Sequence, residues 1–141
     1  MTPCDLKNYE KHEKIGEGRF GKVYKIVDKR SNEIFAAKVS LHESNEFTED
    51  IIKKINDEAS CCSLFDFPSV IKFFGFSQNN FSNKPKPTYI MGYSQNGSLQ
   101  QLLNLLRKGE KVGEWNDTKR LIKIFGIAAG MSYLHNDFHH L

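Results

Sequence analysis

Short apolar runs separated by polar turns make up the first part of the chain. Apolar residues gather at 23–27 and again at 34–39, and the polar stretch RSNE between these runs predicts a β-hairpin. The segment 9–16 predicts a strand ahead of this hairpin, and the runs VIKFFGFS (70–77) and TYIMGY (88–93) predict two more. The last two are separated by QNNFSNKPKP (78–87), a polar turn that contains prolines. The pattern as a whole therefore predicts a sheet of five strands.

Three other segments show the three- and four-residue apolar spacing of amphipathic helices. Residues 46–66 form the first, and Pro68 follows its expected end. The second begins after Ser98, a good N-cap residue, and is rich in leucine. The third covers 115–137, starts near Asn116 or Asp117, and has one apolar face made of Leu121, Ile124, Phe125, Ala128, Met131 and Leu134. The expected fold class is therefore α+β.

Composition and charge exclude several classes of protein. A chain of 141 residues with 39% hydrophobic and 26% charged residues fits one ordinary globular domain or part of a larger one. The net charge is +3 and the lysines are scattered, so nucleic-acid binding is not expected. The N-terminal stretch lacks the apolar core of a signal peptide, and no segment approaches the about 20 apolar residues of a membrane span. We therefore expect no membrane association and a cytoplasmic or nuclear location.

The cysteines and histidines do not predict a metal site. Cys4, Cys61 and Cys62 include no CxxC pair, which argues against a zinc site and against a disulfide framework. Of the histidines, three crowd the C-terminus at 135, 139 and 140, without a cysteine or carboxylate cluster beside them. A solvated tail is favoured over a metal centre there.

Residues 15–23, IGEGRFGKV, contain three glycines at GxGxxG spacing: Gly16, Gly18 and Gly21. Such glycines let backbone N–H groups approach phosphate oxygens, because no Cβ stands in the way. In a dinucleotide-binding Rossmann unit they lead into a helix. Here they lead into a predicted strand, so a nucleotide-dependent dehydrogenase is rejected. A phosphate-binding loop between two strands and a plain glycine-rich hairpin remain as the alternatives.

The motifs that follow these glycines occur in an order that resembles the eukaryotic protein kinase family. They are AAK (36–38), EASCCSLFDFPSVIKFFGF (58–76), YIMGY (89–93), NGSL (96–99) and IAAGMSYLH (127–135). NGSL and GMSYLH are most similar to serine/threonine kinases of the tyrosine-kinase-like group. The resemblance implies a small lobe at 9–91, with a five-stranded antiparallel sheet and one regulatory helix, and a hinge at 92–97. The start of an incomplete large lobe, with two helices, would follow at 98–141, and residues 1–8 would be an N-terminal tail.

The resemblance also implies an ATP site. Amides of the glycine loop would hold the β- and γ-phosphates, Val23 and Ala36 would enclose the adenine ring, and Met91 would be the gatekeeper behind it. Val23 and Ala36 would equally suit an ordinary strand core, and Ser98 is either a ribose contact or only a helix N-cap. The implied ATP-binding residues are Ile15, Gly16, Glu17, Gly18, Arg19, Phe20, Gly21, Val23, Ala36, Lys38, Glu58, Met91, Gly92, Tyr93, Ser94 and Ser98.

Lys38 is the most informative of these residues. A lysine among apolar strand residues needs a partner for its ammonium group, and the resemblance implies an ion pair with Glu58 that holds Lys38 against the α- and β-phosphates. Pro68 selects Glu58 over Asp57 and Glu49 as this partner. The alternative is an edge-strand lysine whose ammonium group lies in water.

In the family, an HRD catalytic loop and then a DFG motif follow soon after YLH, whereas this sequence runs NDFHHL to residue 141. The aspartate base and the Mg²⁺ ligands of those motifs are therefore missing, and no catalytic or metal-binding residue is assigned, although the family uses Mg²⁺ with ATP. We expect a truncated domain that is inactive by itself.

The apolar face at 115–135 would then lack its usual cover, which predicts a protein partner or self-association through it. The alternative function is a non-catalytic, kinase-like interaction module.

Overall fold

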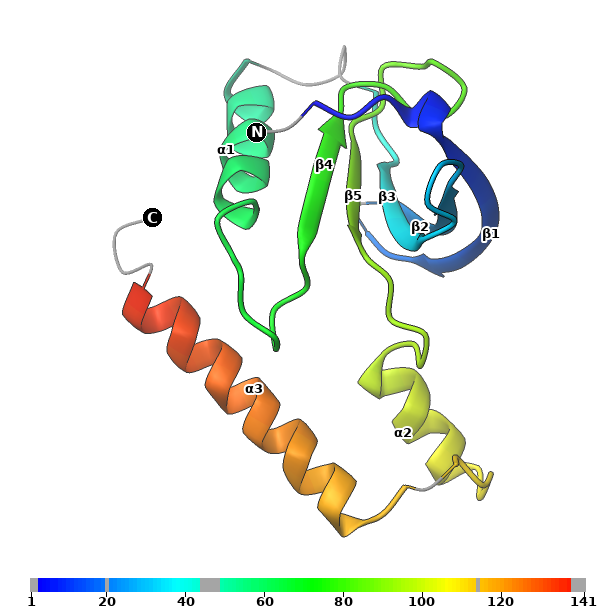
Figure 1. Cartoon of the computed structure of the whole chain (residues 1–141), viewed down its shortest axis with the longest axis vertical. Coiled ribbons are helices and arrows are strands. Elements are labelled where there is room, and N and C mark those ends of the chain that lie inside the picture. The colour runs from blue at the N-terminus through cyan, green and yellow to red at the C-terminus, as the bar shows by residue number, and fades with distance from the viewer. Residues whose placement is uncertain (1–2, 20, 44–48, 114, 138–141) are drawn as a thin grey trace. The chain divides into compact units, whose positions relative to one another are not determined.

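The computed structural model describes the backbone of residues 3–19, 21–43, 49–113 and 115–137, and the side chains of these residues except those at 49–52, 54–55, 58 and 137. The chain divides into two compact units (Figure 1). The sheet unit comprises residues 1–66 and 71–93, and the helical unit comprises 67–70 and 94–141.

The sheet unit contains the predicted five-stranded antiparallel sheet, and its strand order is β1-β2-β3-β5-β4. The strands are β1 (Tyr9–Glu17), β2 (Gly21–Asp28), β3 (Ile34–Ser40), β4 (Phe73–Ser77) and β5 (Thr88–Gly92). The polar turn between β2 and β3 is organised by Asp28, whose Oδ1 accepts hydrogen bonds from the N–H groups of Arg30 and Ser31. Asn32 completes this turn with a positive φ of 58°, which asparagine tolerates well.

Strand β4 is shorter than the apolar run at 70–77 predicts. The N–H of Val70 donates to the carbonyl of Phe67 at 2.9 Å, so the chain turns here before it enters the sheet. Ile71 is exposed, and the strand begins only at Phe73. The expected strand over 70–72 is therefore wrong, because a local turn satisfies the backbone there.

Strand alternation builds the core of the sheet unit on one face. Ile26, Ala37 and Ile90 are completely buried, and Leu6 of the short 3-10 helix η1 (Leu6–Asn8) packs onto them. The N-terminal segment also attaches to the edge strand β4, since the N–H of Cys4 donates to the carbonyl of Phe76 at 2.8 Å. Residues 3–8, which the sequence pattern leaves as a tail, thus cover part of the sheet.

Helix α1 (Glu49–Cys62) follows β3 and contacts β4, and its Ala59 is completely buried (Figure 1). The predicted helix at 46–66 ends earlier than expected, because the N–H of Leu64 already closes a tight turn with the carbonyl of Cys61. Residues 44–48, which include the first part of that prediction, lie outside the described residues.

The helical unit contains α2 (Leu99–Arg107) and α3 (Asp117–Asp137). Ser98 caps α2 with a full capping box in which Gln101 is the reciprocal partner. Of the two predicted starting residues, Asn116 is the one that caps α3, because its Oδ1 accepts a hydrogen bond from the N–H of Lys119 at 2.9 Å. The segment 67–70 packs on α3: the rings of Phe67 and Tyr133 stack at 4.7 Å.

The apolar face of α3 is uncovered within the described part of the chain. Leu121, Ile122, Ile124, Phe125, Ile127 and Met131 are all exposed, and Phe125 retains 75% of its accessible surface. Leu121, Ile124, Phe125 and Met131 belong to the face that the sequence predicts to need a partner, whereas Ile122 and Ile127 lie outside it and Leu134 is half-buried.

Candidate functional site

The three glycines lie where β1 leads into β2, with Gly16 near the end of β1, Gly18 in the turn and Gly21 at the start of β2, and they have different structural reasons to be glycine. A Cβ on Gly21 would lie 2.7 Å from the carbonyl oxygen of Val39, so the contact between β2 and β3 excludes any side chain there. A Cβ on Gly18 would meet no atom of the described residues within 4 Å, and one on Gly16 would make only ordinary contact with Val23. The fold therefore requires Gly21 as a glycine, whereas packing does not explain Gly16 or Gly18.

The register of the strands places several predicted site residues on one face of the sheet. Residues directly opposite each other in neighbouring strands share a face, as do alternate residues along one strand. Val23 lies opposite Lys38, and Ala36 lies opposite Met91. Gly16 lies opposite Val23, which brings the glycine turn to the same end of this face. We call Gly16, Val23, Ala36, Lys38 and Met91 the glycine-side face.

Lys38 is half-buried at the centre of the glycine-side face, between Val23 on β2 and Tyr89 on β5. Glu58 lies in α1, but its side chain is outside the described part of the structure. The Lys38–Glu58 ion pair therefore stays a prediction. Phe20, expected at the tip of the glycine turn, also lies outside the described residues.

The predicted hinge begins in β5 and continues beyond it. Gly92 ends the strand, and its N–H donates to the carbonyl of Lys72 at 2.8 Å. Tyr93 closes the sheet unit, whereas Ser94 and Ser98 belong to the helical unit. The hydroxyl of Ser98 accepts a hydrogen bond from the N–H of Gln101, so the N-cap interpretation of this residue is confirmed and its ribose contact stays a prediction.

Paired charges surround the entrance to the glycine turn. Lys14 donates to the carboxylate of Glu17, and this hydrogen bond lowers the pKa of Glu17 and raises the pKa of Lys14. Lys22 lies 3.9 Å from the same carboxylate. Ile15 and Arg19 flank the turn; Ile15 is half-buried and Arg19 is exposed. Glu17 is thus held as an anion by cations on both strands of the hairpin.

Lys25 is a residue of the glycine-side face that sequence reasoning missed. It lies opposite Ala36, and its Nζ is 3.4 Å from Oε1 of Glu13 and 6.0 Å from the centre of the Tyr93 ring. The pKa of Glu13 is lowered, first by a hydrogen bond from its own backbone and then by Lys25. The available signal was strand alternation, because Lys25 is two residues after Val23 and so shares its face.

Metal and membrane features are absent from the described residues. No group of three histidine, cysteine or acidic side chains there is arranged to hold a metal ion. None of the helices described combines the length and the apolar character that crossing a bilayer requires.

Comparison with known proteins places these features in a family. The model of the protein kinase domain matches residues 9–140. An Aurora kinase of Candida glabrata is 30% identical over 92% of this chain and 33% of its own length. LIM domain kinase 1 of Drosophila melanogaster is 32% identical over 88% of this chain and 9% of its own, and the probable serine/threonine-protein kinase PBL5 of Arabidopsis thaliana is 29% identical over 86% and 26%.

The chain spans a third or less of the length of these relatives. The match nevertheless runs from the start of β1 almost to the last residue, and it includes the glycine turn and the whole sheet. The chain therefore belongs to the protein kinase domain family.

Proposed function

We propose that residues 9–141 are the ATP-binding part of a protein kinase that transfers the γ-phosphate of ATP to serine or threonine hydroxyls. The observation that carries this proposal is the register that puts Gly16, Val23, Ala36, Lys38 and Met91 on one face. Apolar side chains beside a lysine and a glycine turn suit a ligand with a flat ring at one end and phosphates at the other. ATP has this chemistry.

The glycines support a phosphate ligand over a plain hairpin. Gly16 and Gly18 have no packing reason to lack a side chain, in contrast to Gly21. A ligand explains these two glycines, because the absence of a side chain lets backbone N–H groups come close to phosphate oxygens. In this proposal Lys38 holds the α- and β-phosphates as a point charge, and Glu58 orients Lys38.

Phosphoryl transfer also needs a base for the substrate hydroxyl and carboxylate or amide ligands for Mg²⁺. The HRD and DFG motifs that supply them in the family do not occur within these 141 residues. We therefore infer that a polypeptide of these residues alone binds nucleotide without transferring phosphate. Mg²⁺, when bound with ATP, would neutralise phosphate charge, and none of its family ligands is assigned here.

A second candidate function rests on α3. Its exposed face, from Leu121 to Met131, is a contiguous apolar surface of the kind that other protein segments cover. The second candidate is thus a non-catalytic, kinase-like module that binds another protein, or a second copy of itself, through α3.

The test is nucleotide affinity measured by isothermal titration calorimetry with ATP and Mg²⁺. Lys38→Met is expected to weaken binding at least about tenfold, since a charged contact to phosphate is lost. Lys108→Met, a change of the same type at an exposed lysine of the helical unit, is the matched control and should leave the affinity unchanged. Equal affinities for the wild type and Lys38→Met would contradict the ATP site.

A phosphotransfer assay on the same samples separates the two candidates further. Transfer that depends on Lys38 would contradict the inferred inactivity of the isolated residues. Co-purification with a full-length kinase that Lys38→Met leaves intact would favour the interaction module.

A further inference from the structure

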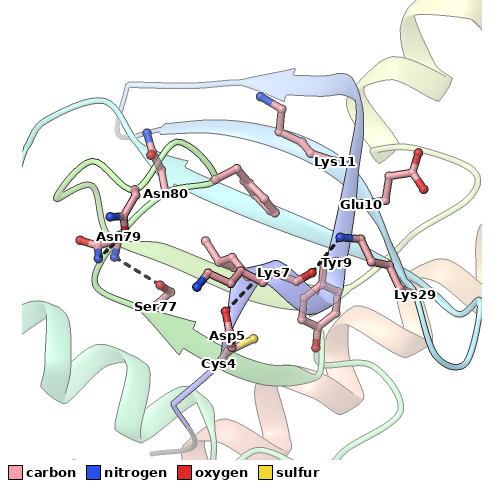
Figure 2. Close-up of a pocket in the computed structure, with 13 residues that line it drawn as sticks. Cys4, Asp5, Lys7, Tyr9, Glu10, Lys11, Lys29, Ser77, Asn79 and Asn80 are labelled. Carbon is pink, nitrogen blue, oxygen red and sulfur yellow. Dashed lines mark hydrogen bonds between the residues drawn. The ribbon is translucent and has the colours of Figure 1, made fainter.

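A second concave site lies away from the glycine-side face. A pocket of about 710 Å³ is lined by the N-terminal segment at 4–7, the start of β1, Lys29 and the β4–β5 loop at 77–83 (Figure 2). We call it the N-terminal pocket. Leu6 in its wall packs on Ala37, which alternates with Ala36 and Lys38 along β3, so the pocket belongs to the opposite side of the sheet.

Hydrogen bonds hold both walls of the N-terminal pocket in place. On one side, the carbonyl of Lys7 accepts from Nζ of Lys29 at 2.8 Å, and the carbonyl of Asn8 accepts from the N–H of Lys29 at 2.9 Å. On the other side, Oδ1 of Asn80 accepts from the N–H groups of Ser82 and Lys84. The pocket is therefore formed without a ligand, and its volume lies in the range of about 300–1,000 Å³ common for small-molecule sites.

The N-terminal pocket is lined by more positively charged than negatively charged side chains. Lys7 and Lys29 lie together, joined by the hydrogen bond from Nζ of Lys29 to the Lys7 carbonyl, and Lys11 lies on β1 (Figure 2). None of the three forms an ion pair with a described residue; the Lys11 ammonium instead lies over the Tyr24 ring at 4.5 Å. The lining also contains the carboxylates of Asp5, which accepts from the N–H of Lys7, and Glu10, which lies 3.8 Å from Nε2 of His12, so three ammonium groups face two carboxylates.

The lysines outnumber the carboxylates of the lining, so the pocket carries a net positive charge that would attract an anion. Asn80 adds a neutral donor: its oxygen is used by its own loop, so its NH₂ group is the end left for a ligand. Leu6, Tyr9 and Phe81 supply apolar surface for an organic part. Lysines without an arginine act as point charges, which suits the compact, multiply charged phosphate group.

We propose that the N-terminal pocket is a binding site for a small phosphate-bearing ligand, separate from the nucleotide site and independent of the kinase proposal. The phosphate could belong to a soluble compound or to a phosphorylated lipid headgroup, and the pocket chemistry is the same for both. The ligand would join the N-terminal segment to the β4–β5 loop across the sheet.

The test measures the affinity of the full chain for inorganic pyrophosphate by isothermal titration calorimetry. The double variant Lys7→Gln/Lys11→Gln is expected to bind at least about tenfold more weakly, since two attractive charges are lost. Lys108→Gln/Lys111→Gln, which removes the same charge from exposed positions in the helical unit, should bind like the wild type. The comparison is repeated in the Lys38→Met background, which removes pyrophosphate binding at the proposed nucleotide site and leaves the opposite face of the sheet unchanged.

A second arm identifies the source of the phosphate. Phosphatidylcholine vesicles with and without a phosphoinositide are sedimented with the wild type and the double variant. Binding to the phosphoinositide vesicles that the double variant loses assigns a lipid headgroup, and pyrophosphate binding without vesicle binding assigns a soluble ligand.

Two results would overturn the proposal: no binding of either probe by the wild type, or equal pyrophosphate binding with and without the double substitution in the Lys38→Met background. Lys7 and Lys11 are exposed, so the unfolding midpoint of the double variant should match that of the wild type. Should the double variant unfold, the single variants Lys7→Gln and Lys11→Gln provide the same comparison, each with about threefold weaker binding.

Discussion

The sheet and helix α3 are both rich in apolar residues, but these residues have opposite environments. Ile90 in β5 is completely buried, whereas Ile124 in α3 keeps 64% of its accessible surface. The sheet finds its complementary surface within the chain, in the neighbouring strands and in Leu6. Helix α3 is covered only in part, by the segment 67–70. A periodic apolar pattern thus predicts a face that needs covering, but it does not say whether the cover lies in the same segment of chain.

The largest expected effect is the difference in the free energy of unfolding between two matched truncations, one in the sheet and one in α3. Ile90→Ala is expected to lower the free energy of unfolding by about 2–5 kcal/mol, because it leaves a cavity in a closed core. Ile124→Ala should change it by less than about 0.5 kcal/mol, since the side chain is already in contact with solvent. Urea denaturation followed by circular dichroism measures both. Similar losses for the two variants would show that α3 is covered in solution, by self-association for example.

The contribution of the N-terminal segment comes next in size. Leu6→Ala is expected to cost about 2 kcal/mol, at the low end for a buried leucine because the residue lies near the chain terminus. Lys7→Ala, the exposed neighbour, is the control and should be close to neutral. The same denaturation experiment measures this pair. An unchanged stability in Leu6→Ala would mean that the segment does not belong to the sheet unit in solution.

Gly21 and Gly18 allow a test, inside the sheet unit, of which glycine the fold requires and which one serves ligand binding. Gly21→Ala should lower the free energy of unfolding by about 1–3 kcal/mol, because the added Cβ collides with the carbonyl of Val39. Gly18→Ala should leave stability nearly unchanged and weaken ATP binding. Thermal unfolding and ATP calorimetry on both variants provide the measurements. A large stability loss in Gly18→Ala would remove the argument that ligand approach explains this glycine.

The smallest effect is a pH dependence at the junction of the N-terminal segment and β1. Burial, assisted by a hydrogen bond with Cys4, raises the pKa of the Tyr9 phenol from 10.0 to about 12. Between these values the unfolded chain loses the phenolic proton while the folded chain keeps it, so stability falls as the pH rises through this window and is unaffected below it. Tyr9→Phe should reduce this alkaline loss. Urea midpoints at about pH 9 and about pH 11 test this, and equal slopes for both proteins would contradict it.

Much of the fold could be predicted because it depends on local patterns. Short apolar runs between polar turns located β2, β3 and β5, and Ser98 marked the start of α2 through its capping chemistry. The beginning of β4 could not be predicted, because the hydrogen bond between Val70 and Phe67 competes with the strand and leaves no sign in hydrophobicity. The position of Leu6 was missed for a related reason. One leucine in a polar stretch carries no period, and only the assembled sheet provides the surface that buries it.

The candidate site also combines features that the sequence predicts with features that only the tertiary structure reveals. The order and spacing of IGEGRFGKV, Lys38, Met91 and Gly92 were sufficient to predict a kinase-like nucleotide site, since the glycines and the lysine supply phosphate chemistry in any arrangement that joins them. Strand register decided that Lys25 lies opposite Ala36 and that Gly21 abuts Val39, whereas a Cβ on Gly18 would meet no described atom within 4 Å. The N-terminal pocket likewise joins Lys7, Lys29 and Asn80, which lie far apart in the sequence. Local chemistry is encoded in neighbouring residues, whereas the meeting of distant side chains depends on how the strands pair and twist.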